Sequence, residues 1–186
     1  MSGASFLEDA RRQGKKLREQ ADRAMAEIPE RELFVRLDPQ ANSIALIAKH
    51  ISGNMRSRWT DFLTTDGEKP DRDRDSEFED EKKDTADSIR ASWEEGWKLF
   101  LGVLDALSPE DLDRTVTIRG EPHTVLQAVQ RQLLHYAAHI GQIVFLAKHL
   151  AGERWKSLSI PRGQSKTFEV AKDGKPYRMP PVGKNV

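Results

Sequence analysis

The segment Arg131–Gln142, RQLLHYAAHIGQ, carries His135 and His139 four residues apart, inside a helical pattern that begins at Thr124 and ends at Ala151. On a helix this spacing places both imidazoles on one face, one turn apart. Two neutral imidazoles so placed can hold one divalent metal ion, and a third ligand from another helix would complete a site with an open coordination position. The same spacing also fits a pair of half-buried histidines that are hydrogen-bonded to their neighbours.

Three further amphipathic patterns predict helices outside this segment. The first covers about residues 5–28. The second begins at Asp38–Pro39, a cap followed by proline at the first helical position, and stops before Asp66. The third covers about residues 85–107, with apolar residues at helical spacing. Four amphipathic helices with one long loop predict an all-α four-helix bundle, and an irregular helical domain is the alternative.

The connections between these patterns are polar. Residues 68–79, EKPDRDRDSEFE, predict a solvated loop, and residues 108–111, SPED, predict a cap and one short helical turn. Residues 113–124 alternate β-branched residues around a glycine, which predicts a short extended hairpin before the last helix. We expect one domain over residues 1–168 and a C-terminal tail, 169–186, that is extended or disordered.

The composition limits the class of protein. The chain has 186 residues, 30 basic and 30 acidic, and no cysteine. The neutral balance disfavours nucleic acid as a partner, and the missing cysteines remove disulfides, thiolate ligands and a cysteine nucleophile. Residues 1–20 are rich in charge, unlike a signal peptide, and no stretch has the roughly 20 apolar residues of a membrane span. We therefore expect a cytoplasmic protein that contacts no membrane.

His50 is the candidate for the third ligand. It follows Leu46 and Ile47 by one turn in the second helical pattern, so it borders the buried stripe. A satisfied core histidine is the alternative interpretation. His123 and His149 lie about 18 Å below and about 15 Å above the pair on a straight helix, too far to share one ion.

Two kinds of metal chemistry lack their sequence motifs. Tyr136 replaces the glutamate of a His-Glu-x-x-His protease motif. No Glu-x-x-His motif is present, although the di-metal sites of ferritin-like bundles need several of them. A single mononuclear site is therefore the better hypothesis.

Other polar residues of the second helix are candidates for supporting roles. Asn54 and Asp61 follow His50 by one and three turns and could orient its imidazole, although a solvated or capping role suits Asp61 better. Helical geometry turns Arg56 and Arg58 away from that histidine. Gly141 and its neighbouring alanines permit a close helix contact, either in a symmetric dimer or inside one bundle. The large aromatic residues are interpreted as core or interface packing, and an aromatic substrate pocket is the alternative: Trp59, Trp93, Trp97 and Phe100.

Several of these segments resemble a known family. Residues 47–70, IAKHISGNMRSRWTDFLTTDGEKP, look like the front half of a DinB/YfiT-like protein. Residues 115–123, TVTIRGEPH, and 135–143, HYAAHIGQI, resemble its back half, as does SIPRGQS at 159–165. The resemblance covers roughly residues 39–168 and is nearest to a bacterial subgroup without an assigned activity.

The resemblance implies a bundle with an up-down-down-up path, a frequent homodimer, and one nickel or zinc ion held by His50, His135 and His139. Relatives include thiol-dependent transferases and isomerases that use mycothiol, bacillithiol or glutathione, and others are called metal-dependent hydrolases. Our leading hypothesis is a mononuclear metal-dependent enzyme that acts on a small-molecule substrate, as a thiol-dependent S-transferase or a hydrolase. The alternative is a non-catalytic, metal-stabilised stress-response or binding protein.

Overall fold

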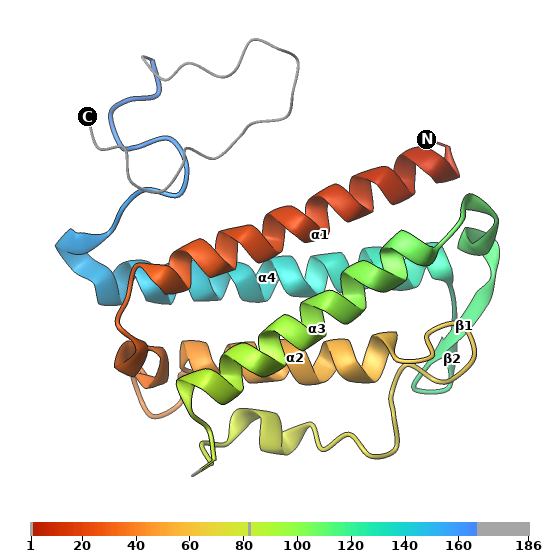
Figure 1. Cartoon of the computed structure of the whole chain (residues 1–186), viewed down its shortest axis with the longest axis horizontal. Helices are drawn as coiled ribbons and strands as arrows, with labels where there is room; N and C mark the ends of the chain where they lie inside the picture. The colour runs from red at the N-terminus through yellow and green to blue at the C-terminus, as the bar shows by residue number, and fades with distance from the viewer. Residues whose placement is uncertain (1, 82, 167–186) are drawn as a thin grey trace.

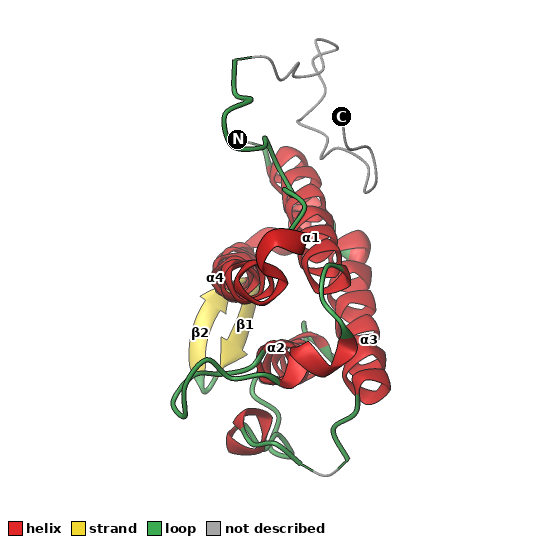
Figure 2. Cartoon of the chain, turned by 90° about the vertical axis from the view of Figure 1, so that its left-hand side faces the viewer, coloured by secondary structure: helices red, strands yellow, loops and turns green. Residues whose placement is uncertain are grey.

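The computed structural model describes residues 2–81 and 83–166, and this part of the chain is mostly helical. Four α-helices pack together, and a small hairpin lies beside them before the last helix (Figures 1 and 2). The helices are α1 (Gly3–Ala26), α2 (Ile44–Trp59), α3 (Ala86–Ala106) and α4 (Val125–Ala151), and the strands are β1 (Thr115–Ile118) and β2 (Glu121–Thr124). The predicted helical class and the hairpin are confirmed.

Side-chain caps explain where three of the helices begin. Thr85 and Thr124 each form a reciprocal capping box at the start of α3 and α4, as the sequence predicts for α4. The predicted start of the second helix at Asp38 was wrong. Asp38 Oδ1 instead accepts the backbone N–H groups of Gln40 and Ala41 in a turn, and Ser43, five residues later, caps α2.

The end of α2 also differs from the prediction. The helix stops at Trp59, and Thr60 has an extended ψ of 126°. Asp61 then adopts a positive φ of 47°, and its carbonyl accepts the hydroxyls of Thr64 and Thr65. The left-handed residue turns the chain away from the helix axis, so the segment before Asp66 is a turn and not a helix.

An aromatic cluster fills the middle of the core. Trp59 from α2, Trp97 and Phe100 from α3, and Tyr136 from α4 are each at most 1% exposed. The Phe100 ring centroid lies 4.9 Å from that of Trp59 and 5.3 Å from that of Tyr136. The predicted core role of the tryptophans and Phe100 is confirmed, and this cluster fixes how α2, α3 and α4 face one another.

The hairpin is held to the end of α2. Its turn residues, Arg119 and Gly120, have positive φ values of 57° and 74°, the geometry that tight antiparallel hairpins favour. Asp66 accepts the backbone N–H groups of both residues, and the Gly67 N–H donates to Thr117 O at 2.8 Å. These bonds fix the start of the loop that follows α2.

The loop over residues 68–79 was predicted to be solvated, and for two of its residues this was wrong. The side chains of Arg72 and Glu77 are only 4% and 7% exposed. The loop runs below α2 in Figure 1, and its short helical turn, Asp75–Phe78, packs against that helix. Its alternating charges pair with one another, which makes their burial tolerable.

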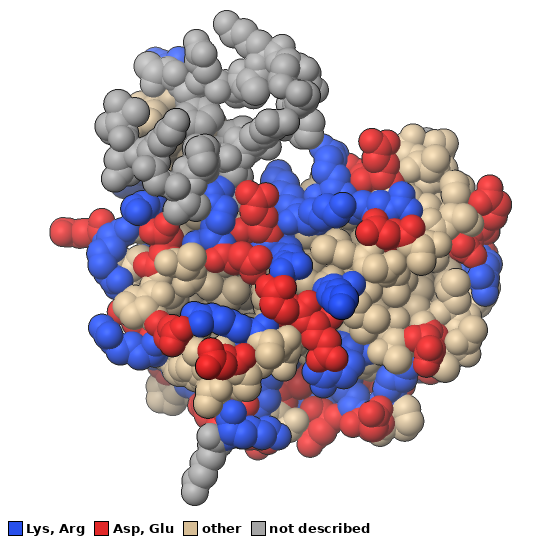
Figure 3. Space-filling model, viewed as in Figure 1, with Lys and Arg blue, Asp and Glu red and all other residues tan. Residues whose placement is uncertain are grey.

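The surface agrees with the balanced composition. Figure 3 shows basic and acidic side chains interspersed over the visible face, without a dominant patch of one sign. Among the described residues, no helix combines the length and apolar character needed to cross a membrane. Residues 155–166 have no regular helix or strand, and the predicted tail, 169–186, lies outside the described residues.

Candidate metal centre

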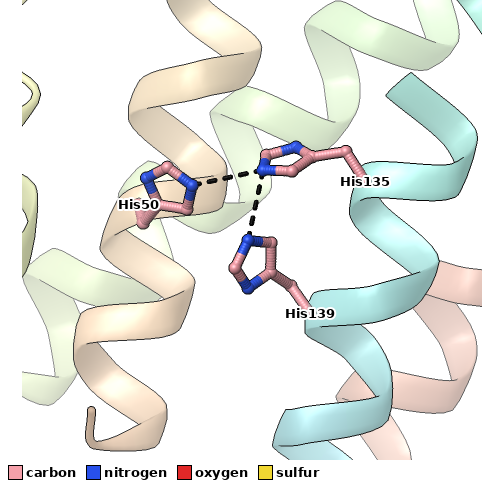
Figure 4. A group of neighbouring side chains, drawn as sticks. All are labelled: His50, His135 and His139. Atoms are coloured by element: carbon pink, nitrogen blue, oxygen red, sulfur yellow. Dashed lines mark hydrogen bonds between the residues drawn. The ribbon is translucent and has the colours of Figure 1, made fainter. Parts of the chain in front are cut away.

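Three histidines converge between α2 and α4. Figure 4 shows His50 from α2 opposite His135 and His139 from α4, with their ring nitrogens turned toward one another. His135 Nε2 lies 3.3 Å from His50 Nε2 and 3.1 Å from His139 Nε2. One ring nitrogen of each residue lies within 4.8 Å of the others, so the group could hold a single metal ion.

The spacing of these nitrogens fits a metal ion. Zinc binds imidazole nitrogen at roughly 2.0–2.1 Å, so two ligand nitrogens of a tetrahedral ion lie about 3.3 Å apart. The two Nε2–Nε2 distances of 3.3 and 3.1 Å are close to that value. Three imidazoles leave one tetrahedral position for another ligand.

Hydrogen bonds at the opposite ring nitrogens orient two of the imidazoles. His50 Nδ1 lies 2.8 Å from Glu77 Oε2, and a carboxylate can only accept, so the proton lies on Nδ1. His139 Nδ1 lies 3.0 Å from Gln142 Oε1 in the same type of contact. Both Nε2 atoms are then bare and point their lone pairs into the space between the helices, which is the form that binds a metal.

Glu77 is itself held firmly. Arg72 donates to it from two nitrogens, Nε to Oε1 at 2.8 Å and Nη2 to Oε2 at 2.9 Å, a bidentate pair. Burial alone would raise the pKa of Glu77, but the hydrogen bonds from His50 and Arg72 outweigh it and hold that pKa below its usual value. Arg72 also donates to Glu68, so an ion-paired chain runs from the loop to the imidazole of His50.

Gly53 makes room for this chain on α2. A Cβ at this position would lie 2.3 Å from Glu77 Oε1 and 2.8 Å from its Cδ. Glu77 is held in this position by its bidentate pair with Arg72 and its contact with His50, so a side chain at Gly53 would displace it from both partners. Glycine at this helical position therefore lets the loop carboxylate reach His50.

The environment keeps the two imidazoles of α4 neutral. Burial, followed by the nearby His139 and His50, lowers the pKa of His135 to about 3. Burial also lowers the pKa of His139. His50 is 4% exposed and stacks on Phe78 at 4.6 Å between ring centroids, while the other two histidines are half-buried. Neutral rings near the surface suit a site that a metal and a further ligand can enter.

The other sequence candidates lie elsewhere. Asn54 Oδ1 accepts the Tyr136 hydroxyl, so it orients the tyrosine and no imidazole. Asp61 is an exposed turn residue, as the capping interpretation expects. His123 contacts Glu121 O and the Arg131 guanidinium, outside the three-histidine group.

The two arginines of α2 differ from each other. Arg56 is exposed and pairs with Glu95 at 3.6 Å, away from His50 as expected. Arg58 is 3% exposed and lies 3.6 Å from Glu68. Burial lowers the pKa of its guanidinium. The sequence does not predict that this arginine is enclosed.

Sequence reasoning missed Glu77, Arg72 and Gln142 as partners of the site. One usable signal was Phe78, an aromatic residue inside an otherwise charged loop, because a large ring there needs a surface to pack on. Another was Gln142, three residues after His139 on the same helix face. The bidentate pairing of Arg72 with Glu77 could not be predicted, because basic and acidic residues alternate in this segment and the sequence does not single out one pair.

A polar cleft of about 800 Å³ lies behind the site, between α2, the loop and the start of α3. Glu77 and Arg72 line it, together with Gly53 and Lys69, but the three histidines do not. The cleft therefore contacts the group only through the carboxylate that orients His50.

The fold and the site together define a class of protein: a helical bundle in which three histidines from two helices can hold one metal ion. The chain belongs to the DUF1572 family, described as a protein of unknown function, whose profile matches residues 1–164. No curated protein matches the chain. The family has no assigned activity, so an argument about function has to start from the site.

Proposed function

We propose that this protein is a mononuclear metal-dependent enzyme of the cytoplasm, with a nickel or zinc ion held by His50, His135 and His139. The observation that carries the proposal is the convergence of three Nε2 atoms at ligand spacing, 3.1 and 3.3 Å, with two rings oriented from behind. An acceptor at the far nitrogen fixes the tautomer and the orientation of each ring, as the outer partners of metal-binding histidines do. The substrate class is a small molecule.

The residues assign the roles within such a site. A water or a low-molecular-weight thiol at the open position would have its pKa lowered by the metal and become a nucleophile near neutral pH. Glu77 uses one oxygen on Arg72 and the other on both Arg72 and His50. It therefore holds the His50 proton in place and is not free to take a proton from a substrate. A metal that activates the nucleophile, with Glu77 only orienting His50, fits a thiol-dependent S-transferase or a hydrolase.

The proposal extends to the wider relationship of the family. We infer that the chain is DinB/YfiT-like, with an up-down-down-up helix path and one domain over residues 1–168. The four helices, the hairpin before the last helix and the three-histidine group support this inference. The resemblance of residues 47–70 and 135–143 supports it independently of the geometry.

The metal is tested by element analysis of protein purified without a histidine tag. We expect about one equivalent of nickel or zinc, and a His135→Ala variant should lose at least about 100-fold in affinity, more than outer partners of ligands contribute. His123→Ala is the matched control and should bind as the wild type does. Absence of stoichiometric metal, with unchanged stability when all three ligands are replaced, would sink the proposal.

A homodimer through α4 is part of the same proposal. Leu134 and Phe145 are each 66% exposed, and Ala138 and Gly141 lie between them on the same helix face. Two large apolar side chains around a small-residue centre suit a second copy of the same face. Light scattering should give a dimer for the wild type and a monomer for Leu134→Asp, while Lys98→Asp, at an exposed position on α3, should stay dimeric. A monomeric wild type would contradict this part.

A structural metal is the second candidate, because the ligands come from two different helices and an ion would tie α2 to α4. In that case metal should raise the melting temperature while the metal-loaded protein fails to bind or turn over any thiol. A change in the cobalt-substituted spectrum on adding a thiol would favour the enzyme, since it requires an open ligand position.

A further inference from the structure

His135 differs from the other two histidines at its outer nitrogen. His50 Nδ1 has Glu77 at 2.8 Å and His139 Nδ1 has Gln142 at 3.0 Å. His135 Nδ1 is sealed from solvent and has no hydrogen-bond partner. If His135 Nε2 holds a metal, the proton moves to Nδ1, and a buried N–H donor without an acceptor is destabilising.

Gln132, on the same helix as His135, has a buried acceptor that lacks a donor. Among residues 2–81 and 83–166, the buried side-chain acceptors without a hydrogen-bond partner are Gln132 Oε1 and Glu81 Oε2. Glu81 Oε2 already lies 2.8 Å from Lys83 Nζ in an ion pair. Gln132 is 2% exposed, so neither its oxygen nor the His135 nitrogen can turn to bulk water.

Helical geometry places the two side chains together. Gln132 precedes His135 by three residues on α4, and side chains three apart share a face. Side chains on a helix lean toward its N-terminus, so the His135 ring lies over the turn that contains Gln132. The sequence Gln132-Leu-Leu-His135 mirrors His139-Ile-Gly-Gln142, in which the glutamine three residues away already contacts the ring.

A second buried group with unpaired donors, the Arg58 guanidinium, lies on the facing helix. Arg58, on the facing helix α2, is 3% exposed, and its Nε and Nη1 have no hydrogen-bond partner. Arg58 lies within electrostatic reach of His135. A carbonyl oxygen has two lone pairs, so accepting from His135 would leave the Gln132 oxygen one further acceptor position.

We propose that Gln132 is a positioning residue for the metal: its Oε1 accepts the Nδ1–H of His135 when His135 Nε2 becomes a ligand. All three ligands would then have an oriented outer nitrogen, from Glu77, Gln132 and Gln142. The inference rests on the proposed metal site.

Gln132→Met tests it, since methionine keeps the volume and removes the acceptor. Chelator competition should show zinc binding weakened by about tenfold, and ¹⁵N-resolved spectra of the zinc-loaded protein should show faster exchange of the His135 Nδ1 proton. The apo protein should be as stable as the wild type or more stable, because a buried unpaired oxygen is gone. Gln132→Glu, which keeps an acceptor, should restore most of the affinity.

The controls separate the two proposals. Wild-type protein that binds no zinc contradicts the metal site itself. Wild-type protein that binds zinc, with Gln132→Met binding equally well and an unchanged His135 proton, overturns the role of Gln132 alone. A Gln132→Glu variant as weak as Gln132→Met also overturns it. Gln142→Met is the comparator, with an expected loss of similar size through His139.

Discussion

The two ends of the α2–α4 contact are built differently. At the C-terminal end of α2, Trp59 and Phe100 pack around Tyr136, whose hydroxyl accepts from Trp59 Nε1 at 2.9 Å and donates to Asn54 at 3.1 Å. Toward the other end, His50 meets two histidines and a carboxylate from a loop. We call these the aromatic end and the histidine end.

This difference between the two ends suggests that the aromatic end contributes mainly to stability and the histidine end mainly to metal binding. The aromatic end buries large side chains and leaves its tyrosine satisfied, so it stabilises the bundle without help from a loop. The histidine end places three imidazole nitrogens close together and needs Glu77 and Arg72 to order it. We therefore expect changes at the aromatic end to cost unfolding free energy, and changes at the histidine end to cost metal affinity.

The largest effect should follow from Trp97→Ala at the aromatic end. Trp97 is 0% exposed, and removing it leaves a large cavity, so urea denaturation should show a loss of about 3–5 kcal/mol. Zinc affinity of the folded variant should stay near that of the wild type. Trp97→Phe is the control. It should cost much less, because it fills most of the space and the buried Trp97 Nε1 has no hydrogen-bond partner to lose. If Trp97→Ala also lost zinc affinity, the aromatic end would contribute to metal binding as well as to stability, contrary to this expectation.

Gly53→Ala should show the reverse pattern at the histidine end. The new Cβ would lie 2.8 Å from Glu77 Cδ, so the carboxylate must shift, and we expect its contact with His50 to weaken. Zinc affinity, measured by chelator competition, should fall by about tenfold or more, the usual cost of losing a partner of a ligand. Gly102→Ala is the matched control, since its Cβ would meet nothing within 4 Å. It should keep the affinity and raise stability by up to about 1 kcal/mol. Unchanged affinity in Gly53→Ala would mean that Glu77 does not orient His50.

This contrast also explains what could be predicted from the sequence. The aromatic end follows from helical periodicity, because Trp59, Trp97 and Phe100 recur on the inward faces of two helices. His50, His135 and His139 follow from spacing for the same reason, and the structure brings them together. Both arguments need only the regular geometry of a helix.

The supporting residues could not be predicted in the same way. Glu77 reaches His50 across 27 positions in the chain, through a loop with no periodicity. Its place depends on Asp66 fixing the loop start, on Gly53 leaving room, and on an ion pair with Arg72. Long-range contacts of this kind carry no local signal, so a charged loop read alone looks solvated.

The smallest expected effect concerns Asp66, where the loop to the histidine end begins. Backbone N–H groups of Glu68, Gly120 and Arg119 lower the pKa of Asp66 to about 2. A depressed folded pKa means that the carboxylate stabilises the fold above its unfolded pKa, near 3.8, and that this contribution is lost as the pH falls toward 2. Because the carboxylate lies near the surface and is partly exposed, solvent screening keeps the contribution at about 1 kcal/mol or less. Asp66→Asn should therefore be less stable than the wild type at pH 6 in urea denaturation, and the difference should shrink between pH 4 and about pH 2. A gap that stays constant over this range would show that the lost hydrogen-bond geometry, and not the charge, is what the loop start requires.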